Sequence, residues 1–223
     1  MDMTIKTLIT GADRGMGYEL ALELGLKGQY IYIGSRNLAR GQAAVARLEA
    51  AGVQAQAVQL DVTEHESIVA AKASITAGLD ILINNAGIAV DHETKPSELS
   101  LDAIRQDFNV NYFGLIDVTQ VFLPLLREAP AGWIINISSA VGSLTLASDA
   151  STSIRKLQAS GYQASKSAVN MFTVNPGWVD TSFGGGGGNR IVKVGVAQTV
   201  ELATSDALTD SGTFSDIDGI VPW

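Results

Sequence analysis

The chain has 223 residues, of which 46% are hydrophobic and 17% are charged, and this length fits one α/β domain over residues 1–223 better than two. Its net charge of −8 argues against nucleic acid or an anionic membrane as a main partner, because either would require a basic face. The chain has no cysteine, and its two histidines are His65 and His92, so disulfides, thiolate chemistry and a metal site such as catalytic zinc are not expected.

Short β-rich runs alternate with longer helical patterns along the chain. Strands are expected over 4–10, 29–35, 53–60 and 79–84, and helices over 15–27, 37–51 and 64–77. The run LDILIN at 79–84 is almost wholly apolar, which is typical of a strand buried on both faces of a parallel sheet. Helical signals follow over 98–128, with Pro124 marking a kink or stop, and 133–137 is a fifth strand. The alternation predicts a doubly wound parallel sheet with right-handed crossovers.

The first strand runs directly into a glycine-rich turn, Thr10-Gly11-Ala12-Asp13-Arg14-Gly15-Met16-Gly17. Its glycines let the backbone turn tightly and approach a pyrophosphate, and the free N–H groups of the next helix point at that anion. Three glycines alone are a weak signal, and a bare turn is the alternative. The position between a strand and a helix in the first βαβ unit favours dinucleotide binding.

The choice of nucleotide depends on the end of the second strand. A site for NAD usually has an acidic residue ~20 residues beyond the loop, where it binds the ribose hydroxyls. Here that position is Ser35, and Arg36 follows it. No carboxylate stands there to repel a 2′-phosphate, and Arg36 or Arg14 could pair with one. The sequence therefore favours NADP(H), and two solvated surface arginines are the alternative.

Seven short motifs occur in a fixed order along nearly the whole chain. They are Thr10-Gly11-x-x-x-Gly15-x-Gly17, Leu60-Asp61-Val62, Asn84-Asn85-Ala86-Gly87, Asn109-Val110-Asn111, Ile137-Ser138-Ser139, Tyr162-x-x-x-Lys166 and Pro176-Gly177-Trp178-Val179-x-Thr181. In this order they resemble the short-chain dehydrogenase/reductase family, close to its carbonyl-reductase-like branch. The resemblance implies a Rossmann-like fold and the NADP(H)-dependent reduction of an aldehyde, ketone or quinone to an alcohol by hydride transfer.

The resemblance also implies a role for each matching residue. Tyr162 would donate the proton, Lys166 would bind the nicotinamide ribose, and Asn111 would position a water in the proton relay. Ser139 would hold the substrate oxygen, with Ser138 the less favoured candidate. The implied cofactor-binding residues are Gly11, Asp13, Arg14, Gly15, Met16, Gly17, Arg36, Asp61, Val62, Asn85, Ala86, Gly87, Tyr162, Lys166, Pro176, Gly177, Val179 and Thr181. Among them, Asp61 would contact the adenine, residues 85–87 would line the ribose side, and Thr181 would lie near the nicotinamide carboxamide.

The spacing of Tyr162 and Lys166 makes chemical sense by itself. Residues four apart share one face of a helix, and a nearby ammonium is expected to lower the pKa of a phenol from about 10. As hydride reaches a carbonyl carbon, negative charge grows on the oxygen, which Tyr162 could protonate while Ser139 donates a hydrogen bond. An isolated Tyr-x-x-x-Lys is usually an ordinary helix face, and the upstream motifs favour the catalytic interpretation.

Two departures from the family pattern stand out. Residues 142–160, between Ser139 and Tyr162, are expected to form an extra loop beside the active site. Only the eight residues 167–174 separate Lys166 from Asn175, too few for the rest of a helix of about 12 residues and a strand of 5–6 residues. The sixth strand and its preceding helix are therefore expected to be shortened, as if a segment were missing around 172–174. A helix over 190–205 and a last strand over 212–218 follow.

The shortened segment keeps a second function open, namely a catalytically impaired dinucleotide-binding protein or a defective isoform of such an enzyme. The expected partners are a small carbonyl or alcohol substrate, with a homodimer left open. No apolar run reaches the ~18 residues that a membrane span needs, and residues 1–10 lack the features of a signal peptide. A cytoplasmic location is the expectation.

Overall fold

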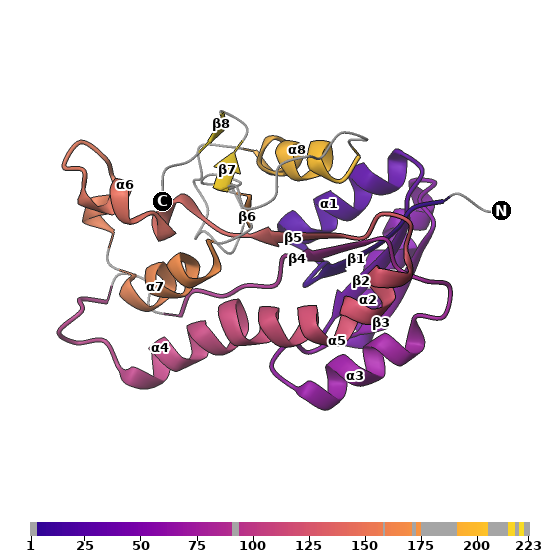
Figure 1. Cartoon of the computed structure of the whole chain (residues 1–223), viewed down its shortest axis with the longest axis horizontal. Helices are drawn as coiled ribbons and strands as arrows, with labels where there is room; N and C mark the ends of the chain where they lie inside the picture. The colour runs from indigo at the N-terminus through magenta and orange to yellow at the C-terminus, as the bar shows by residue number, and fades with distance from the viewer. Residues whose placement is uncertain are drawn as a thin grey trace.

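One twisted sheet runs through the molecule (Figure 1). The computed structural model describes residues 4–90, 94–157, 159–170 and 191–204, and the backbone of strand residues 173–174, 214–216 and 219–220. Within these residues the sheet has eight strands in the order β3-β2-β1-β4-β5-β6-β7-β8. Their bounds are β1 Lys6–Thr10, β2 Tyr30–Ser35, β3 Ala55–Gln59, β4 Ile81–Asn84, β5 Trp133–Ile137, β6 Thr173–Val174, β7 Phe214–Asp216 and β8 Gly219–Ile220. All neighbours pair in parallel except β7 and β8, which pair antiparallel.

Helices cover both faces of this sheet. Their bounds are α1 Gly15–Leu26, α2 Leu38–Ala50, α3 His65–Ser74, α4 Leu101–Phe108, α5 Leu115–Glu128, α6 Leu144–Ser148, α7 Ser160–Val169 and α8 Val192–Leu202. A π-helical turn, η1 (Asn109–Gly114), joins α4 to α5, and two 3₁₀ turns, η2 (Ala140–Gly142) and η3 (Ile154–Lys156), lie between β5 and α7. The predicted doubly wound, Rossmann-like fold is therefore confirmed.

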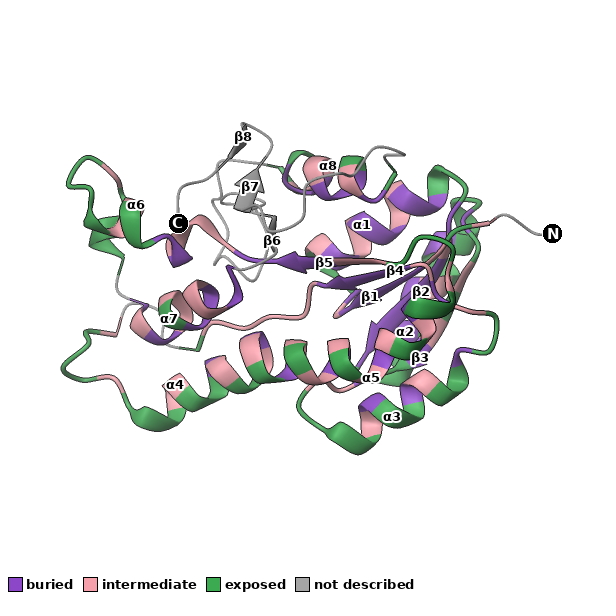
Figure 2. Cartoon of the chain, in the orientation of Figure 1, coloured by how far each residue is buried: buried purple, intermediate pink, exposed green. Residues whose placement is uncertain are grey.

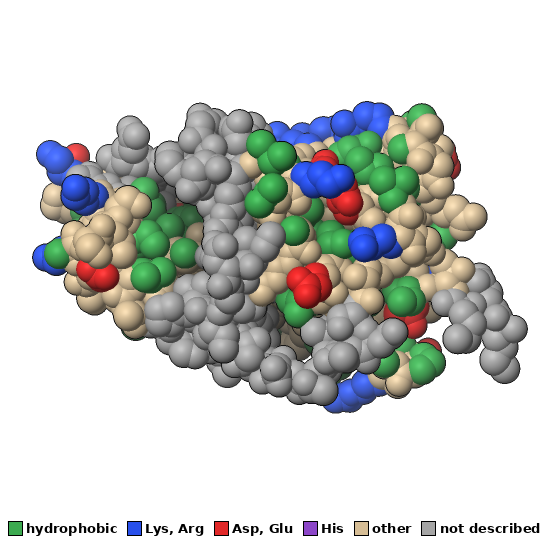
Figure 3. Space-filling view, turned by 90° about the horizontal axis from the view of Figure 1, so that it is seen from above, with side chains coloured by type: hydrophobic (Ala, Val, Ile, Leu, Met, Phe, Trp, Pro, Cys, Tyr) green, Lys and Arg blue, Asp and Glu red, His purple; other side chains and the backbone are tan. Residues whose placement is uncertain are grey.

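The core consists of two apolar layers, one on each side of the sheet. Alternate side chains of a strand point to opposite faces, so Ile9 belongs to the cluster that contains Leu24 of α1 and Val200 of α8. Its neighbour Leu8 belongs to the other cluster, which contains Phe122 of α5. The central strands are almost wholly buried, and the helices turn exposed sides outward (Figure 2). On the described part of the face over α1 and α8, side chains of both charges are interspersed with apolar ones (Figure 3).

The largest departure of the fold from the sequence pattern lies after Lys166. Helix α7 has only ten residues, and β6 has only two. Three residues, 170–172, connect them. The prediction of a shortened helix and sixth strand is confirmed, yet β6 still pairs in register with β5 and β7.

Smaller differences concern the element boundaries. Pro124 does not stop its helix, since α5 continues to Glu128. The expected loop at 142–160 contains the short helical segments α6 and η3, and the antiparallel β8 was not expected. Among the described residues, no helix is both long enough and apolar enough to cross a membrane.

Candidate active site

The loops after β1 and β4 are hydrogen-bonded to each other at the carboxyl edge of the sheet. The Thr10 hydroxyl oxygen accepts bonds from the backbone N–H groups of Asn85 at 3.0 Å and Ala86 at 2.9 Å. In return, Nδ2 of Asn85 donates to the main-chain oxygen of Thr10 at 2.8 Å. Because β1 and β4 lie where the strand order reverses, this edge is where open α/β sheets bind ligands.

The glycines of the first loop leave room beside this edge. A Cβ atom on Gly17 would lie 2.6 Å from Nδ2 of Asn85 and 2.7 Å from the Gly11 oxygen, so no side chain fits there. Gly15 has a φ of +57° and faces open space. The N-terminus of α1 begins at this residue, so its free N–H groups and positive dipole end meet the open space. The turn therefore fits the pyrophosphate of a dinucleotide.

The rest of the first loop carries the predicted residues Asp13, Arg14 and Met16. Asp13 forms an ion pair with Arg40 of α2, with 3.0 Å between Nε and Oδ2. Its main-chain oxygen also accepts a bond from Nη2 of Arg47 at 3.2 Å. Arg14 is exposed, and Met16 packs against the core. Neither Arg40 nor Arg47 was predicted, because the contact of α2 with the loop exists only in the fold.

Three further predicted residues lie at the same edge. Arg36 follows β2 and is exposed. Asp61 follows β3, and its Oδ1 accepts bonds from the backbone N–H of Thr63 at 3.0 Å and its hydroxyl at 2.7 Å. Val62 lies against η1, since a Cβ on Gly114 would come within 2.6 Å of the Val62 oxygen. The ends of β1, β2 and β3 thus place these residues beside the glycine loop.

Three predicted catalytic residues, Ser139, Tyr162 and Lys166, lie where α7 packs on the end of β5. Ser139 follows β5, and its side chain is hydrogen-bonded to that of Tyr162. Lys166 is one turn further along α7, with its Nζ 5.9 Å from the centre of the Tyr162 ring. The same Nζ donates to the main-chain oxygen of Ile137 at 2.8 Å. The structure therefore brings Tyr162, Ser139 and Lys166 together.

Burial dominates the ionisation of this group. It raises the pKa of Tyr162 above the usual value for a phenol, and the charge of Asp107 raises it further, whereas the hydrogen bond with Ser139 lowers it. Burial also lowers the pKa of Lys166 to about 8. The prediction of a lowered Tyr162 pKa is wrong for this structure, because loss of hydration outweighs the nearby ammonium. Tyr162 consequently holds its proton at neutral pH.

The two serines after β5 have different surroundings. The buried hydroxyl of Ser138 donates to the main-chain oxygen of Lys166 at 3.2 Å and is also hydrogen-bonded to Oδ1 of Asn170. Nδ2 of Asn170 donates to the main-chain oxygen of Gly142 at 3.0 Å. Ser138 therefore ties β5 to α7, while Ser139 lies against Tyr162.

Asn111 lies within the π-helical turn η1 and is buried. Its Oδ1 accepts from the Ile88 N–H at 2.8 Å, and its Nδ2 donates to the Ile88 oxygen at 2.8 Å and to the Ser165 hydroxyl at 2.9 Å. The side chain thus joins the segment after Gly87 to α7. A Cβ on Gly87 would lie 3.4 Å from Oδ1 of Asn111 and 3.7 Å from Nζ of Lys166, so this motif also borders the site.

The sequence interpretation missed one buried acid at the site. Asp107 is fully buried, and its Oδ1 accepts a bond from the Val90 N–H at 2.9 Å. It stands four residues before Asn111, so helical spacing could have indicated it. Four predicted cofactor residues, Pro176, Gly177, Val179 and Thr181, lie outside the described residues.

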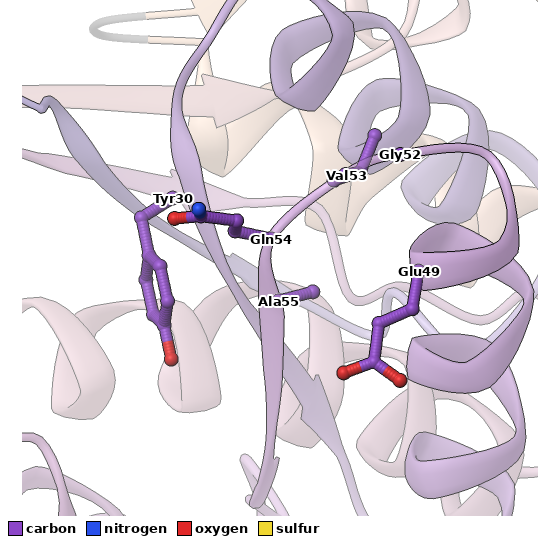
Figure 4. A pocket seen from close by; sticks show the side chains of 6 residues that line it. All are labelled: Tyr30, Glu49, Gly52, Val53, Gln54 and Ala55. Atoms are coloured by element: carbon purple, nitrogen blue, oxygen red, sulfur yellow. The ribbon is translucent and has the colours of Figure 1, made fainter.

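A depression of about 460 Å³ elsewhere on the molecule does not compete with this site. It is lined by Tyr30, Glu49 and the four residues 52–55, and Glu49 is the only charged residue in this lining (Figure 4). Because β2 begins at Tyr30 and β3 begins at Ala55, the depression lies at the amino ends of the strands. That edge is opposite the one that carries the glycine loop and Tyr162.

Comparison with known proteins supports the same interpretation. The family model for short chain dehydrogenases matches residues 6–177. The chain belongs to this oxidoreductase family. The short-chain dehydrogenase anuI of Penicillium roqueforti is 33% identical over 88% of this chain and 87% of its own length. The carbonyl reductase [NADPH] 1 of Mus musculus is 34% identical, but the match spans 60% of this chain and only 48% of that protein.

A solved structure is similar over almost the full length of this short-chain dehydrogenase. The NADPH-bound carbonyl reductase from chicken fatty liver is 28% identical, with a TM-score of 0.84. The match covers 99% of each chain. The fold is therefore preserved although α7 and β6 are short.

Proposed function

We propose that this protein reduces a small aldehyde, ketone or quinone to an alcohol with NADP(H), and that Tyr162 donates the proton. One observation carries the proposal. Tyr162 is hydrogen-bonded to Ser139 and has Lys166 on the same helix face. This group lies at the carboxyl edge of the sheet that also carries the glycine loop.

The residues of the glycine loop fit the nucleotide. The open space at Gly15 and the start of α1 would hold the pyrophosphate. Asp61 and the segment 85–87 would border the adenine and ribose, and the exposed Arg14 and Arg36 would pair with a 2′-phosphate. One of the carbonyl reductases named above is an NADPH carbonyl reductase and the other has NADPH bound, which supports the phosphorylated nucleotide. When bound, it would supply the hydride.

The side chains of this protein would then stabilise and neutralise the negative charge that develops on the substrate oxygen. Ser139 would donate a hydrogen bond to that oxygen, and Tyr162 would transfer its phenolic proton as negative charge develops. The raised pKa of Tyr162 keeps that proton in place before reaction. The Lys166 ammonium would stabilise the tyrosinate that remains. Asn111, next to Ser165 on α7, would position the water that returns a proton.

A second candidate is a dinucleotide-binding protein with impaired catalysis. Its support is the two-residue β6 and the three-residue connection from α7, because the family motif at 176–181 follows this strand directly. The two candidates share the nucleotide site. They differ only in turnover.

Thermal melts of the full chain with NADPH or NADH, followed by NADPH oxidation over a panel of aldehydes, ketones and quinones, separate these candidates. The proposal predicts a larger rise in Tm with NADPH and turnover of at least one carbonyl. A rise in Tm without turnover on any panel member would favour the impaired protein. No change in Tm with either nucleotide would refute both.

A further inference from the structure

The ion pair between Asp13 and Arg40 joins two segments beside the proposed nucleotide site, the loop after β1 and the start of α2. Asp13 belongs to the loop after β1, and its side chain is only 10% exposed. Arg40 belongs to the first turn of α2, where its N–H donates to the capping Asn37 at 3.0 Å, and its side chain is 47% exposed. The two charges meet with 3.0 Å between Nε and Oδ2.

The loop after β1 and the start of α2 lie on either side of the place where the 2′ group of the adenosine ribose would bind. In dinucleotide sites that group is read at the end of the second strand, next to the glycine loop. Here β2 ends at Ser35, and the N–H of Ala12 donates to the main-chain oxygen of Gly34 at 3.0 Å. The loop is thus held against the end of β2, and the Asp13–Arg40 pair crosses from one to the other.

We propose that Asp13 sets the nucleotide selectivity of this protein by holding Arg40 away from the 2′-phosphate, an inference that rests on the proposed function. The carboxylate of Asp13 competes with a 2′-phosphate for the Arg40 guanidinium, so the phosphate gains only part of the pairing that Arg40 could give it. The same carboxylate can accept a hydrogen bond from the free 2′-hydroxyl of NADH. Asp13 therefore reduces the preference for NADPH over NADH that the arginines create.

The contacts around the pair support this competition. Because Arg40 is half-exposed, its pairing with Asp13 is weak enough to exchange for a phosphate. Asp13 is held by its backbone, since its main-chain oxygen accepts from Arg47 at 3.2 Å and the Arg47 guanidinium lies 4.0 Å from the centre of the Tyr18 ring. The carboxylate thus stays in the site while Arg40 is free to turn.

Titration of wild type, Asp13→Asn, Arg40→Gln and the double variant with NADPH and NADH, followed by nucleotide fluorescence, tests the proposal. Asp13→Asn should tighten NADPH by about fivefold to tenfold and weaken NADH. Arg40→Gln should weaken NADPH by about tenfold, because a charge-assisted bond is lost. In the Arg40→Gln background, Asp13→Asn should have a much smaller effect on NADPH than it has alone.

The Asp102–Arg105 pair provides a matched control. It is an ion pair of 2.8 Å at the start of α4, so Asp102→Asn makes the same change in net charge outside the site and should leave the NADPH-to-NADH affinity ratio unchanged. If Asp13→Asn leaves the NADPH-to-NADH affinity ratio unaltered, or if Asp102→Asn alters it equally, the selectivity role of Asp13 is overturned while the proposed function stands. Undiminished tightening by Asp13→Asn in the Arg40→Gln background would overturn the route through Arg40. Wild type that binds neither nucleotide would instead refute the proposed function.

Discussion

The ammonium of Lys166 donates a hydrogen bond to the main-chain oxygen of Ile137, the last residue of β5, at 2.8 Å. A side chain of α7 is thereby hydrogen-bonded to the end of the central strand β5. Ser138 adds a second link, since its hydroxyl donates to the Lys166 oxygen at 3.2 Å. These bonds explain how α7 keeps its place on β5 although the helix and the following strand are short.

The buried Lys166 makes the stability of the protein pH-dependent. Its pKa of about 8 in the folded protein lies below about 10.4 in the unfolded chain, so between these values the unfolded chain binds more protons. The free energy of unfolding should therefore rise with pH in this window, by up to about 3 kcal/mol. Urea unfolding at pH 7.5 and 9.5 measures the rise, and Lys166→Met should abolish it. An equal rise in Lys166→Met would contradict the assignment.

Gly17 should tolerate no side chain, in contrast to Gly87. A Cβ on Gly17 would stand 2.6 Å from Nδ2 of Asn85, whereas one on Gly87 would make ordinary contacts at 3.4 Å or more. Gly17→Ala should therefore cost about 1–3 kcal/mol of stability and weaken nucleotide binding. Gly87→Ala should leave stability nearly unchanged. Denaturant melts of the two variants check the contrast, and equal stabilities would argue against the close packing of the loops.

The two adjacent serines should respond differently to alanine. Ser139→Ala removes the bond to Tyr162 and should lower kcat by about 10²-fold with little change in stability. Ser138→Ala leaves the buried Asn170 with one partner fewer and should cost about 1–3 kcal/mol of stability. Steady-state kinetics and urea unfolding of both variants separate the roles. The reverse pattern would assign the substrate oxygen to Ser138.

Asp107 should tune the pH range of reduction. Its charge raises the pKa of Tyr162, and the proposed reduction requires the protonated phenol. Asp107→Asn should therefore move the alkaline fall of kcat/KM to lower pH, while the amide oxygen can still accept the Val90 N–H bond. A suitable control is Asp117→Asn, because Asp117 is paired with His65 away from the site. Identical pH profiles for Asp107→Asn and wild type would eliminate this role.

The sequence predicted the framework because its signals are local. The apolar run that ends at Asn84 marked a buried strand, and the spacing of Tyr162 and Lys166 marked a shared helix face. The shortening of β6 followed from counting the residues after Lys166. Each of these inferences needs only neighbours along the chain.

The missed features depend on contacts between distant residues. Asp107 reaches Val90 across 17 positions, and Asp13 reaches Arg40 across 27. The pKa of Tyr162 was predicted in the wrong direction for the same reason. Lys166 is visible four residues away in the sequence, but the burial that outweighs its charge arises only when α7 packs on β5.

The most direct test of the proposed chemistry is the steady-state rate of NADPH oxidation by Tyr162→Phe with a carbonyl substrate that the wild type reduces. Tyr30→Phe is the matched control, since the Tyr30 hydroxyl contacts Gln56 at the opposite end of the strands. We predict that Tyr162→Phe loses about 10²–10⁴-fold in kcat while it still binds NADPH, and that Tyr30→Phe keeps its activity. Undiminished turnover by Tyr162→Phe would contradict the assignment of Tyr162 as proton donor.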